Sequence, residues 1–241
     1  MSDLAKVGVV TQARMTSTRL PGKVLMTAGG RSMLAHQVTR LQRAGLPVYV
    51  ATTTNATDDP IVAAAADLGV PVHRGSEDDV LARYVGAVHE FGLETVVRVT
   101  SDCPLIDGAV VARGVAVFEA AADPRLYVSN TQPRTYPRGF ELEVFGAQAL
   151  LEADRDAHSP AEREHVTPYL YSGRYPMRPV LREGDASRFR VTLDTPEDLV
   201  VITRLIEEHG AADLDAEGII AVLESHPDLV AVNAHIEQKQ L

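Results

Sequence analysis

The sequence has few of the features that would place it in several common protein classes. Its 241 residues include one cysteine, Cys103, no tryptophan and only 5% aromatic residues. A single cysteine excludes an internal disulfide framework, so the chain is not a small disulfide-stabilised domain. There is no run of 18 apolar residues and no signal-peptide pattern, and we therefore expect a cytoplasmic protein that is not inserted in a membrane.

Acidic residues are missing from one long stretch. The formal net charge is -10, which argues against binding to nucleic acid or to an anionic membrane surface. Residues 4–57, however, contain no Asp or Glu and seven Lys or Arg residues. We expect two of these cations, Arg40 and Arg43, to decorate an exposed helix face. The other cations favour an anion-binding site in the loop after the first predicted strand.

Short apolar segments alternate with amphipathic segments along the chain. Strands are predicted at residues 6–11, 47–52, 70–73 and 95–100, and helices at residues 32–44, 59–68 and 107–122 and after Asp79. Asp59 and Asp79 are expected to be helix caps. With 45% hydrophobic residues the chain can bury a full core. This alternation predicts one α/β domain, residues 1–241, with a mostly parallel, doubly wound sheet.

The alternation breaks between residues 129 and 182. A proline-rich polar segment, residues 129–139, precedes residues 140–145, whose alternation predicts a half-exposed strand. The capping box Ser159-Pro160-Ala161-Glu162 predicts the start of a helix that runs through Leu170. We interpret residues 129–182 as an insertion that serves as a cap or a dimer arm. A strand at residues 189–193 and helices at residues 196–209 and 215–225 are predicted after it.

The loop that follows the first predicted strand carries the clearest functional signal. Residues 13–23 contain three cations, three hydroxyl side chains, one glycine and no acid. The segment is not a P-loop, because Val24 follows Gly22-Lys23 and Ser17 stands where the first glycine belongs, and it lacks the Rossmann fingerprint. Arginine forks and a lysine point charge suit phosphate oxygens, so the segment predicts a triphosphate-binding loop. The alternative is a solvated basic loop.

Two aspartates are predicted to follow strands at one edge of the sheet. Asp102 follows the strand at residues 95–100, and Asp194 follows the one at residues 189–193; each precedes a proline by two residues. Ligands bind at the carboxyl ends of parallel strands, and carboxylates are ligands that Mg²⁺ prefers. We therefore predict that Asp102 and Asp194 share a magnesium ion. The alternative is that each is only a helix cap or turn residue.

The remaining polar residues leave more than one interpretation open. His165 either orients a hydroxyl or binds an acidic substrate, or it is an ordinary helix histidine. Tyr136 and Arg138 lie in the irregular segment, where they either recognise a carboxylate or phosphate or are surface residues. The other histidines lack ligand spacing, so no zinc site is predicted. Cys103 is expected to be a packed residue rather than a nucleophile.

Three motifs together resemble a known family. They are Gln12-Ala13-Arg14-Met15-Thr16-Ser17-Thr18-Arg19-Leu20-Pro21-Gly22-Lys23, Asp102-Cys103-Pro104-Leu105-Ile106 and Leu193-Asp194-Thr195-Pro196-Glu197-Asp198-Leu199. The sequence resembles the cytidylyltransferases that make CMP-activated acidic sugars, such as CMP-acylneuraminate and CMP-3-deoxy-manno-octulosonate synthetases. It looks closest to the spore coat polysaccharide biosynthesis branch, with further matches at residues 74–81, 136–141, 163–169 and 233–239.

The resemblance implies a fold, substrates and an assembly. The fold would be a three-layer α/β/α sandwich of the glycosyltransferase-A-like, Rossmann-like type. CTP and Mg²⁺ would be required, and the inserted arm of each subunit would reach its neighbour in a homodimer. The sequence departs from the family at Ser101, where the family usually has glycine. A side chain there is expected to tighten the nucleotide pocket.

The family's functional residues map onto this sequence in three groups. The catalytic groups would be Arg14, Lys23, Asp102 and Asp194, and the last two would also hold the metal. The nucleotide-binding residues would be Ala13, Arg14, Ser17, Arg19, Lys23, Arg74, Ser76, Asp79, Val80 and Ser101. The acceptor-binding residues would be Arg98, Tyr136, Arg138, Glu141, Arg163 and His165.

The resulting prediction is a Mg²⁺-dependent transfer of CMP from CTP to an acidic sugar or related acidic acceptor, with release of pyrophosphate. Sugar phosphates and phosphonates remain possible acceptors. One alternative is a glycosyltransferase of the same architecture, although Asp102-Cys103-Pro104 lacks the second acid of an Asp-x-Asp motif. Another is a catalytically silent nucleotide-binding protein, against which the cationic loop and both carboxylates argue.

Overall fold

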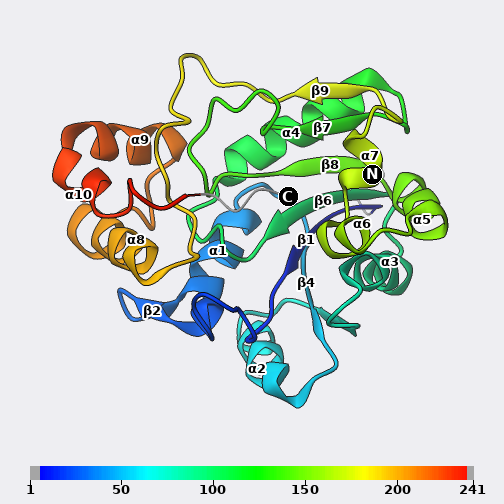
Figure 1. Ribbon diagram of the computed structural model, residues 1–241, viewed down its shortest axis with the longest axis horizontal. Helices are drawn as coiled ribbons and strands as arrows, with labels where there is room; N and C mark the ends of the chain where they lie inside the picture. Colours follow the sequence, from blue (N-terminus) through cyan, green and yellow to red (C-terminus); the bar gives the residue numbers. More distant parts are fainter. Residues whose placement is uncertain (1–5, 238–241) are drawn as a thin grey trace.

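A seven-stranded sheet forms the middle layer of the protein (Figure 1), in a computed structural model that describes residues 6–237. Its strand order is β5-β4-β1-β6-β8-β7-β9. The strands are β1 (Val7–Gln12), β4 (Val48–Thr53), β5 (Val72–Gly75), β6 (Thr95–Thr100), β7 (Tyr127–Ser129), β8 (Glu143–Gly146) and β9 (Met177–Pro179). The first four in the order are mutually parallel, whereas β8 is antiparallel to β6 and β7. The predicted α/β fold with a mostly parallel sheet is confirmed.

Helices cover both faces of this sheet. One hydrophobic cluster packs α1 (Met33–Gln42), α2 (Asp59–Asp67), α4 (Gly108–Ala121), α8 (Pro196–His209), α9 (Ala216–Ser225) and α10 (Pro227–Ala231) on one face. A second cluster packs α3 (Val80–Phe91), α5 (Ala147–Asp156) and α7 (Pro168–Tyr171) on the other, where α6 (Pro160–His165) contacts α3. Two short strands, β2 (Thr27–Ala28) and β3 (Arg31–Ser32), form a separate hairpin. None of the described helices is long and apolar enough to cross a bilayer.

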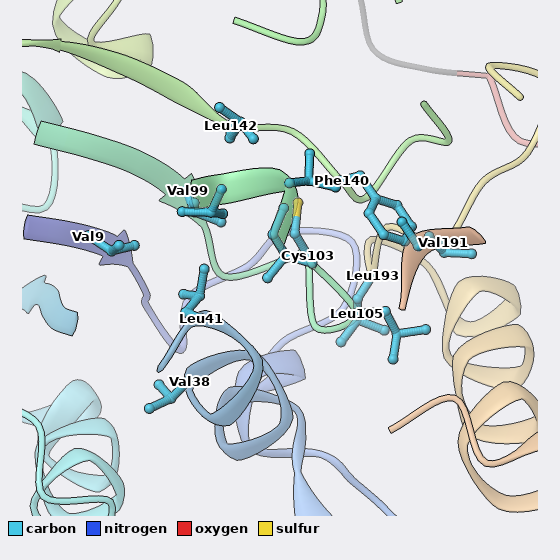
Figure 2. Packing of buried hydrophobic residues seen from close by; sticks show 14 of the residues in the cluster. Val9, Val38, Leu41, Val99, Cys103, Leu105, Phe140, Leu142, Val191 and Leu193 are labelled. Carbon is cyan, nitrogen blue, oxygen red and sulfur yellow. The ribbon is translucent and has the colours of Figure 1, made fainter. Parts of the chain in front are cut away.

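The two clusters follow from the alternation of side chains along the strands. Val9 and Val10 are neighbours in β1, yet Val9 belongs to one cluster and Val10 to the other, because successive side chains point to opposite faces. Figure 2 shows part of the first cluster, in which Cys103, Leu105 and Leu193 lie close together. Burial raises the pKa of the Cys103 thiol well above its usual value, as expected for a packed cysteine. The residues that flank Asp102 and Asp194 therefore share one core.

Most predicted helix starts are confirmed by their caps. The Asp79 side chain accepts a hydrogen bond from the backbone N–H of Ala82, and Ser159 and Thr195 each form a capping box. Asp59 was predicted as a cap, but it is the first residue of α2 and Asp58 precedes the helix. The Asp58 carboxylate is occupied elsewhere, accepting from the Thr53 hydroxyl and the Met15 backbone N–H.

The predicted strand at residues 189–193 is wrong. Only an isolated bridge between Arg138 and Arg190 occurs there. The apolar alternation of Phe189, Val191 and Leu193 reflects burial in the core rather than pairing in the sheet. The backbone groups of this segment bond to two separate loops, since Val191 N–H donates to the Arg138 carbonyl and Leu193 N–H to the Asp102 carbonyl, both at 2.7 Å.

Residues 129–182 also depart from the expected elements. The segment supplies β8 and β9 to the central sheet, and β8 begins at Glu143 rather than at residue 140. The strand is not half-exposed, because β8 lies between β6 and β7 and its last three residues are buried. The predicted helix from residue 160 to 170 is divided into α6 and α7 at Val166, whose φ is 72°. Pro168 lacks a backbone N–H and restricts the residue before it, which favours this break.

Arg40 does not decorate an exposed face as predicted. It is 2% exposed and donates hydrogen bonds of 2.8 to 3.1 Å to the carbonyls of Ile106, Ala211, Ala212 and Leu214. Burial lowers the pKa of Arg40 to about 10. The guanidinium thus joins α1 to the loop after α8, where a helix-face pattern alone suggests an exposed residue. Arg43 does lie at the surface, paired with Asp213.

Candidate active site

A cavity of about 630 Å³ opens at the carboxyl ends of β1 and β6. These two parallel strands end side by side, and Ala13 and Ser101 follow them directly. The predicted site residues in the cavity lining are Ala13, Arg14, Ser17, Arg19, Lys23, Val80, Arg98, Ser101, Asp102, His165 and Asp194. The lining residues that the sequence did not single out as binding residues are Gln12, Thr18, Arg83, Thr100 and Glu164.

Lys23 stands between the two predicted metal ligands. Its Nζ donates to Asp194 Oδ1 at 2.7 Å and lies 3.8 Å from Asp102 Oδ2. The loop that carries it closes on itself, because Gly22 adopts a φ of 71° and its backbone N–H donates to the Met15 carbonyl. A left-handed residue at this turn favours glycine. Asp102 and Asp194 follow Lys23 by 79 and 171 positions in the sequence, yet both lie beside its ammonium group.

The loop's two arginines lie closer to solvent. Arg19 Nη2 is 2.9 Å from Asp194 Oδ2, and Arg14 Nη1 is 3.9 Å from Glu77 Oε1. Their side chains are 41% and 39% exposed, compared with 11% for Lys23. The loop therefore presents two accessible guanidinium groups around one buried ammonium group, an arrangement that matches a polyanion of several phosphates.

Asp102 is held next to Asp194 through its backbone. The Asp102 carbonyl accepts hydrogen bonds from Leu193 N–H at 2.7 Å and from the Thr192 hydroxyl at 3.1 Å. Its carboxylate accepts a hydrogen bond from the Thr100 hydroxyl. The turn after β6 and the segment before α8 are consequently fixed to each other, which brings together two carboxylates that are far apart in the sequence.

A buried ion pair fixes the backbone of Asp194. Arg190 and Asp198 form two parallel hydrogen bonds of 2.8 Å, and Asp198 Oδ2 accepts the backbone N–H groups of Asp194 and Thr195 at 3.0 and 3.1 Å. Asn233 donates to Asp198 Oδ1 at 2.8 Å. Burial opposes ionisation of Asp198, but the hydrogen bonds from Arg190 and Asn233 outweigh it, and the pKa of this carboxyl lies below its usual value. In the sequence, the supporting role of Asp198 is indicated by the capping box that it forms with Thr195.

We expect Asp198→Asn to lower the free energy of unfolding by about 3–5 kcal/mol, because it removes the carboxylate that makes both 2.8 Å hydrogen bonds with the buried Arg190, whose contact with Asp194 is longer, at 3.7 Å. The folded pKa of Asp198 lies below the unfolded one, so its contribution is present at neutral pH and is lost as the pH falls below about 4. Urea denaturation of the parent and the variant between pH 3 and 7 measures both effects. Glu224→Gln, which disrupts the exposed pair with Arg188, is the control and should change little.

Asp102 and Asp194 have the chemistry and the convergence that a divalent cation requires. One oxygen of each lies within ion-pair distance of the same Lys23 ammonium, so both carboxylates already face one positive charge. Within residues 6–237 no group of three or more His, Cys, Asp or Glu side chains is placed to hold a metal. Two carboxylates leave most coordination positions to other oxygens, which suits an ion that also binds substrate phosphates.

Beyond the loop, the cavity wall is built on Arg98 of β6. Arg98 pairs with Glu143 of β8, and its Nη2 donates to Gln12 Oε1 at 3.2 Å. Its guanidinium lies 5.7 Å from the centre of the Tyr84 ring, and burial raises the pKa of Tyr84 to about 12. The charge of Arg98 is thus already balanced by a protein carboxylate. Glu164 and His165 of α6 complete this side of the cavity.

Four residues predicted to contact nucleotide or acceptor make contacts with other parts of the protein near the ends of β4 and β5 instead of lining the cavity. Arg74 donates to the carbonyls of Thr53 and Asn55, both at 2.8 Å. The Ser76 hydroxyl accepts the Asp79 backbone N–H, and Asp79 in turn caps α3 and pairs with Arg163.

Besides Arg163, three more predicted acceptor residues lie outside the cavity lining. Tyr136 is 2% exposed and its hydroxyl accepts a hydrogen bond from Arg113. Burial lowers the pKa of Arg138. Glu141 pairs with Arg134 at 2.5 Å and also accepts the Gly139 backbone N–H. Glu141 Oε2 is 3.4 Å from Cys103 Sγ, so this group packs directly behind the Asp102 turn.

Comparisons with known proteins agree with this geometry. The family described as Cytidylyltransferase matches residues 9–233. The spore coat polysaccharide biosynthesis protein SpsF of Bacillus subtilis is 32% identical over 232 residues, which are 91% of this chain and 94% of SpsF. A 3-deoxy-manno-octulosonate cytidylyltransferase of Solibacter usitatus is 27% identical and covers 84% of this chain and 95% of its own length. A solved cytidylyltransferase of Leptospira borgpetersenii superposes with a TM-score of 0.89 at 32% identity, covering 98% of this chain and 99% of its own.

Proposed function

The chain belongs to the cytidylyltransferase family, and from that premise we propose that it transfers CMP from CTP to an acidic sugar, with Mg²⁺ as cofactor and pyrophosphate as the second product. Nucleotidyl transfer from CTP is the chemistry of the family. The observation that supports the proposal is the convergence of Asp102 and Asp194 on Lys23, beside the cationic loop. Such a transfer requires positioning and charge neutralisation more than covalent help.

Each part of the cavity then has a task. Arg14, Arg19 and Lys23 bind the triphosphate, with Ser17 and the backbone N–H groups of the loop between them. Asp102 and Asp194 would hold Mg²⁺, which neutralises phosphate charge when bound. The oxygen of an acceptor hydroxyl forms a bond to the α-phosphorus and releases its proton to water, while the bond to the α–β bridging oxygen breaks and pyrophosphate leaves with that oxygen. The main contribution of the three cations is to reduce the electrostatic repulsion caused by the negative charge at the α-phosphate.

The acceptor is proposed to be a 2-keto sugar acid. His165 lines the cavity, and Arg134, Arg138 and Arg163 lie in the same part of the chain. A relative that covers most of this chain is named for 3-deoxy-manno-octulosonate, a sugar acid of this kind. Arg98, Tyr136 and Glu141 remain proposed acceptor residues, either in contact with the acceptor or as support for those that contact it. Residues 129–182 are proposed to act as a cap or as the arm of a homodimer.

A pyrophosphate-release assay tests the proposal. CTP, ATP, GTP and UTP are each combined with a 2-keto sugar acid, a sugar phosphate, a phosphonate and a neutral sugar, with Mg²⁺ or with EDTA. We expect release only with CTP, the sugar acid and Mg²⁺ together, and none with the neutral sugar, which brings no negative charge to the cations in and around the cavity.

Other outcomes would contradict a particular part of the proposal. Equal release with the neutral sugar would show that the acceptor need not be acidic, and undiminished release in EDTA would exclude the metal. Transfer of sugar from a nucleotide sugar would favour the glycosyltransferase alternative. Tight CTP binding without turnover on any acceptor would favour a nucleotide-binding protein.

A further inference from the structure

Arg83 is a buried cation in the cavity that the proposed chemistry does not use. It lies in the first turn of α3, is 2% exposed and contributes to the cavity lining. Its Nη1 donates to the Ser76 carbonyl at 2.8 Å. Its Nε is buried and has no hydrogen-bond partner among residues 6–237. An arginine inside a protein normally has more of its five donors satisfied.

No carboxylate of the described chain pairs with Arg83. The carboxylates whose charges act on it are those of Asp58 and Glu77, and no ion pair forms with either within the described ranges. Their oxygens accept hydrogen bonds from other groups, namely Met15 N–H, Thr52, Thr53, Thr16 and Asn55. A buried guanidinium without a paired carboxylate is costly, which indicates that a ligand in the cavity accepts from the donors of Arg83 that face it.

Arg83 lies away from Lys23 and Asp194, whereas Arg14 is near enough for its positive charge to act on Arg83. Lys23 and Arg19 contact Asp194, which is held beside Asp102 at the end of β6, whereas Arg83 bonds to Ser76, directly after β5. In the sheet, β4 and β1 separate β5 from β6, so the two strand ends lie about 14 Å apart at about 4.8 Å per strand. In Figure 1, α3 and α8 accordingly lie on opposite sides of β1. A nucleotide with its phosphates at Lys23 would extend its base toward Arg83.

The stem of Arg83 is held against Gly75. A Cβ on Gly75 would lie 3.0 Å from Arg83 Cγ and 3.1 Å from its Cβ, so glycine allows the side chain to pack on the strand. Together with the bond to Ser76, this packing fixes the plane of the guanidinium. A fixed plane with free donors is what bidentate recognition requires.

We propose that Arg83 recognises the base of CTP by donating hydrogen bonds to O2 and N3 of cytosine. These two acceptors are adjacent on the ring and match the guanidinium fork. Uracil carries a hydrogen on N3, which would face a donor of Arg83, so the same contact disfavours UTP. Arg83 is thus a specificity-determining residue, and this assignment rests on the proposed use of CTP.

Calorimetry of the parent protein with three nucleotides is the first part of the test. We expect CTP to bind about 10- to 100-fold more tightly than UTP, which is the range for one bidentate contact with a base. The third nucleotide is 3-deaza-CTP, which has CH in place of N3 and keeps O2 and the amino group. It should bind more weakly than CTP by about the same factor as UTP. Equal binding of CTP and 3-deaza-CTP would overturn the proposal, whether or not any variant folds.

Arg83→Met and Arg83→Lys form the second part. Both should reduce the ratio of CTP to UTP affinity to within about threefold, because neither can donate to O2 and N3 together. Lys23→Met is the matched control, since it should weaken CTP and UTP in parallel and leave their ratio unchanged. An equal loss of both nucleotides in the Arg83 variants would assign Arg83 to the phosphates and overturn the proposal. Failure of the parent to bind CTP would refute the proposed function instead.

Discussion

Asp102→Asn is expected to lower kcat by about a thousandfold while leaving the fold intact. The carboxylate faces Lys23 and Asp194 in the cavity, so replacing it with an amide removes one of the two proposed metal ligands. The amide has nearly the same shape. The backbone carbonyl of residue 102 retains its hydrogen bonds from Leu193 and Thr192, which hold the two halves of the site together.

Pyrophosphate release measured against Mg²⁺ concentration provides the readout. The variant should need more Mg²⁺ and still stay far below the parent at saturation, whereas its melting temperature should change little. Asp67→Asn, at the exposed end of α2, is the matched control and should behave like the parent. Parent-like release by Asp102→Asn at saturating Mg²⁺ would show that Asp102 does not hold the metal.

The parallel half of the fold could be predicted because its signals are local. Each of its strands is a short apolar run bounded by a helix, and some of these helices have recognisable caps, such as Asp79 and Asp107. Residues 189–193 have an equally good strand pattern, but their backbone bonds to Arg138 and Asp102 instead of to a strand. Alternation in a sequence reports burial, and burial does not specify the hydrogen-bond partner. The three-residue strands β7 and β9 are too short to give a pattern at all.

The site shows the same division between local and distant signals. Arg14, Arg19 and Lys23 could be predicted because they are close in sequence and free of acids. Arg83 could not, because a polar residue in the first turn of a helix usually faces solvent. Its burial depends on Gly75 and on the loop after β5, which no helical period reveals. Arg40 misled the prediction for the same reason, since its partners come from residues 106 and 211–214.

Lys23→Met is expected to weaken CTP binding by about a hundredfold, a loss of about 2.7 kcal/mol. Methionine fills the space of the buried lysine stem but lacks the ammonium group that lies deepest in the cationic loop. The change also removes the positive charge between Asp102 and Asp194. The two carboxylates then repel each other, so Mg²⁺ alone should raise the melting temperature of the variant more than that of the parent.

These two effects have opposite signs, which separates a specific role of Lys23 from general loss of charge. Thermal shifts with Mg²⁺ alone and calorimetry with CTP measure them independently. Arg31→Met is the control, because Arg31 lies in the same acid-free region but is exposed on β3, outside the cavity lining. If Arg31→Met weakened CTP binding as much as Lys23→Met, the loop would act only through its overall positive field. If Lys23→Met bound CTP as tightly as the parent, Lys23 would not belong to the triphosphate site, and its contacts with Asp102 and Asp194 would be structural.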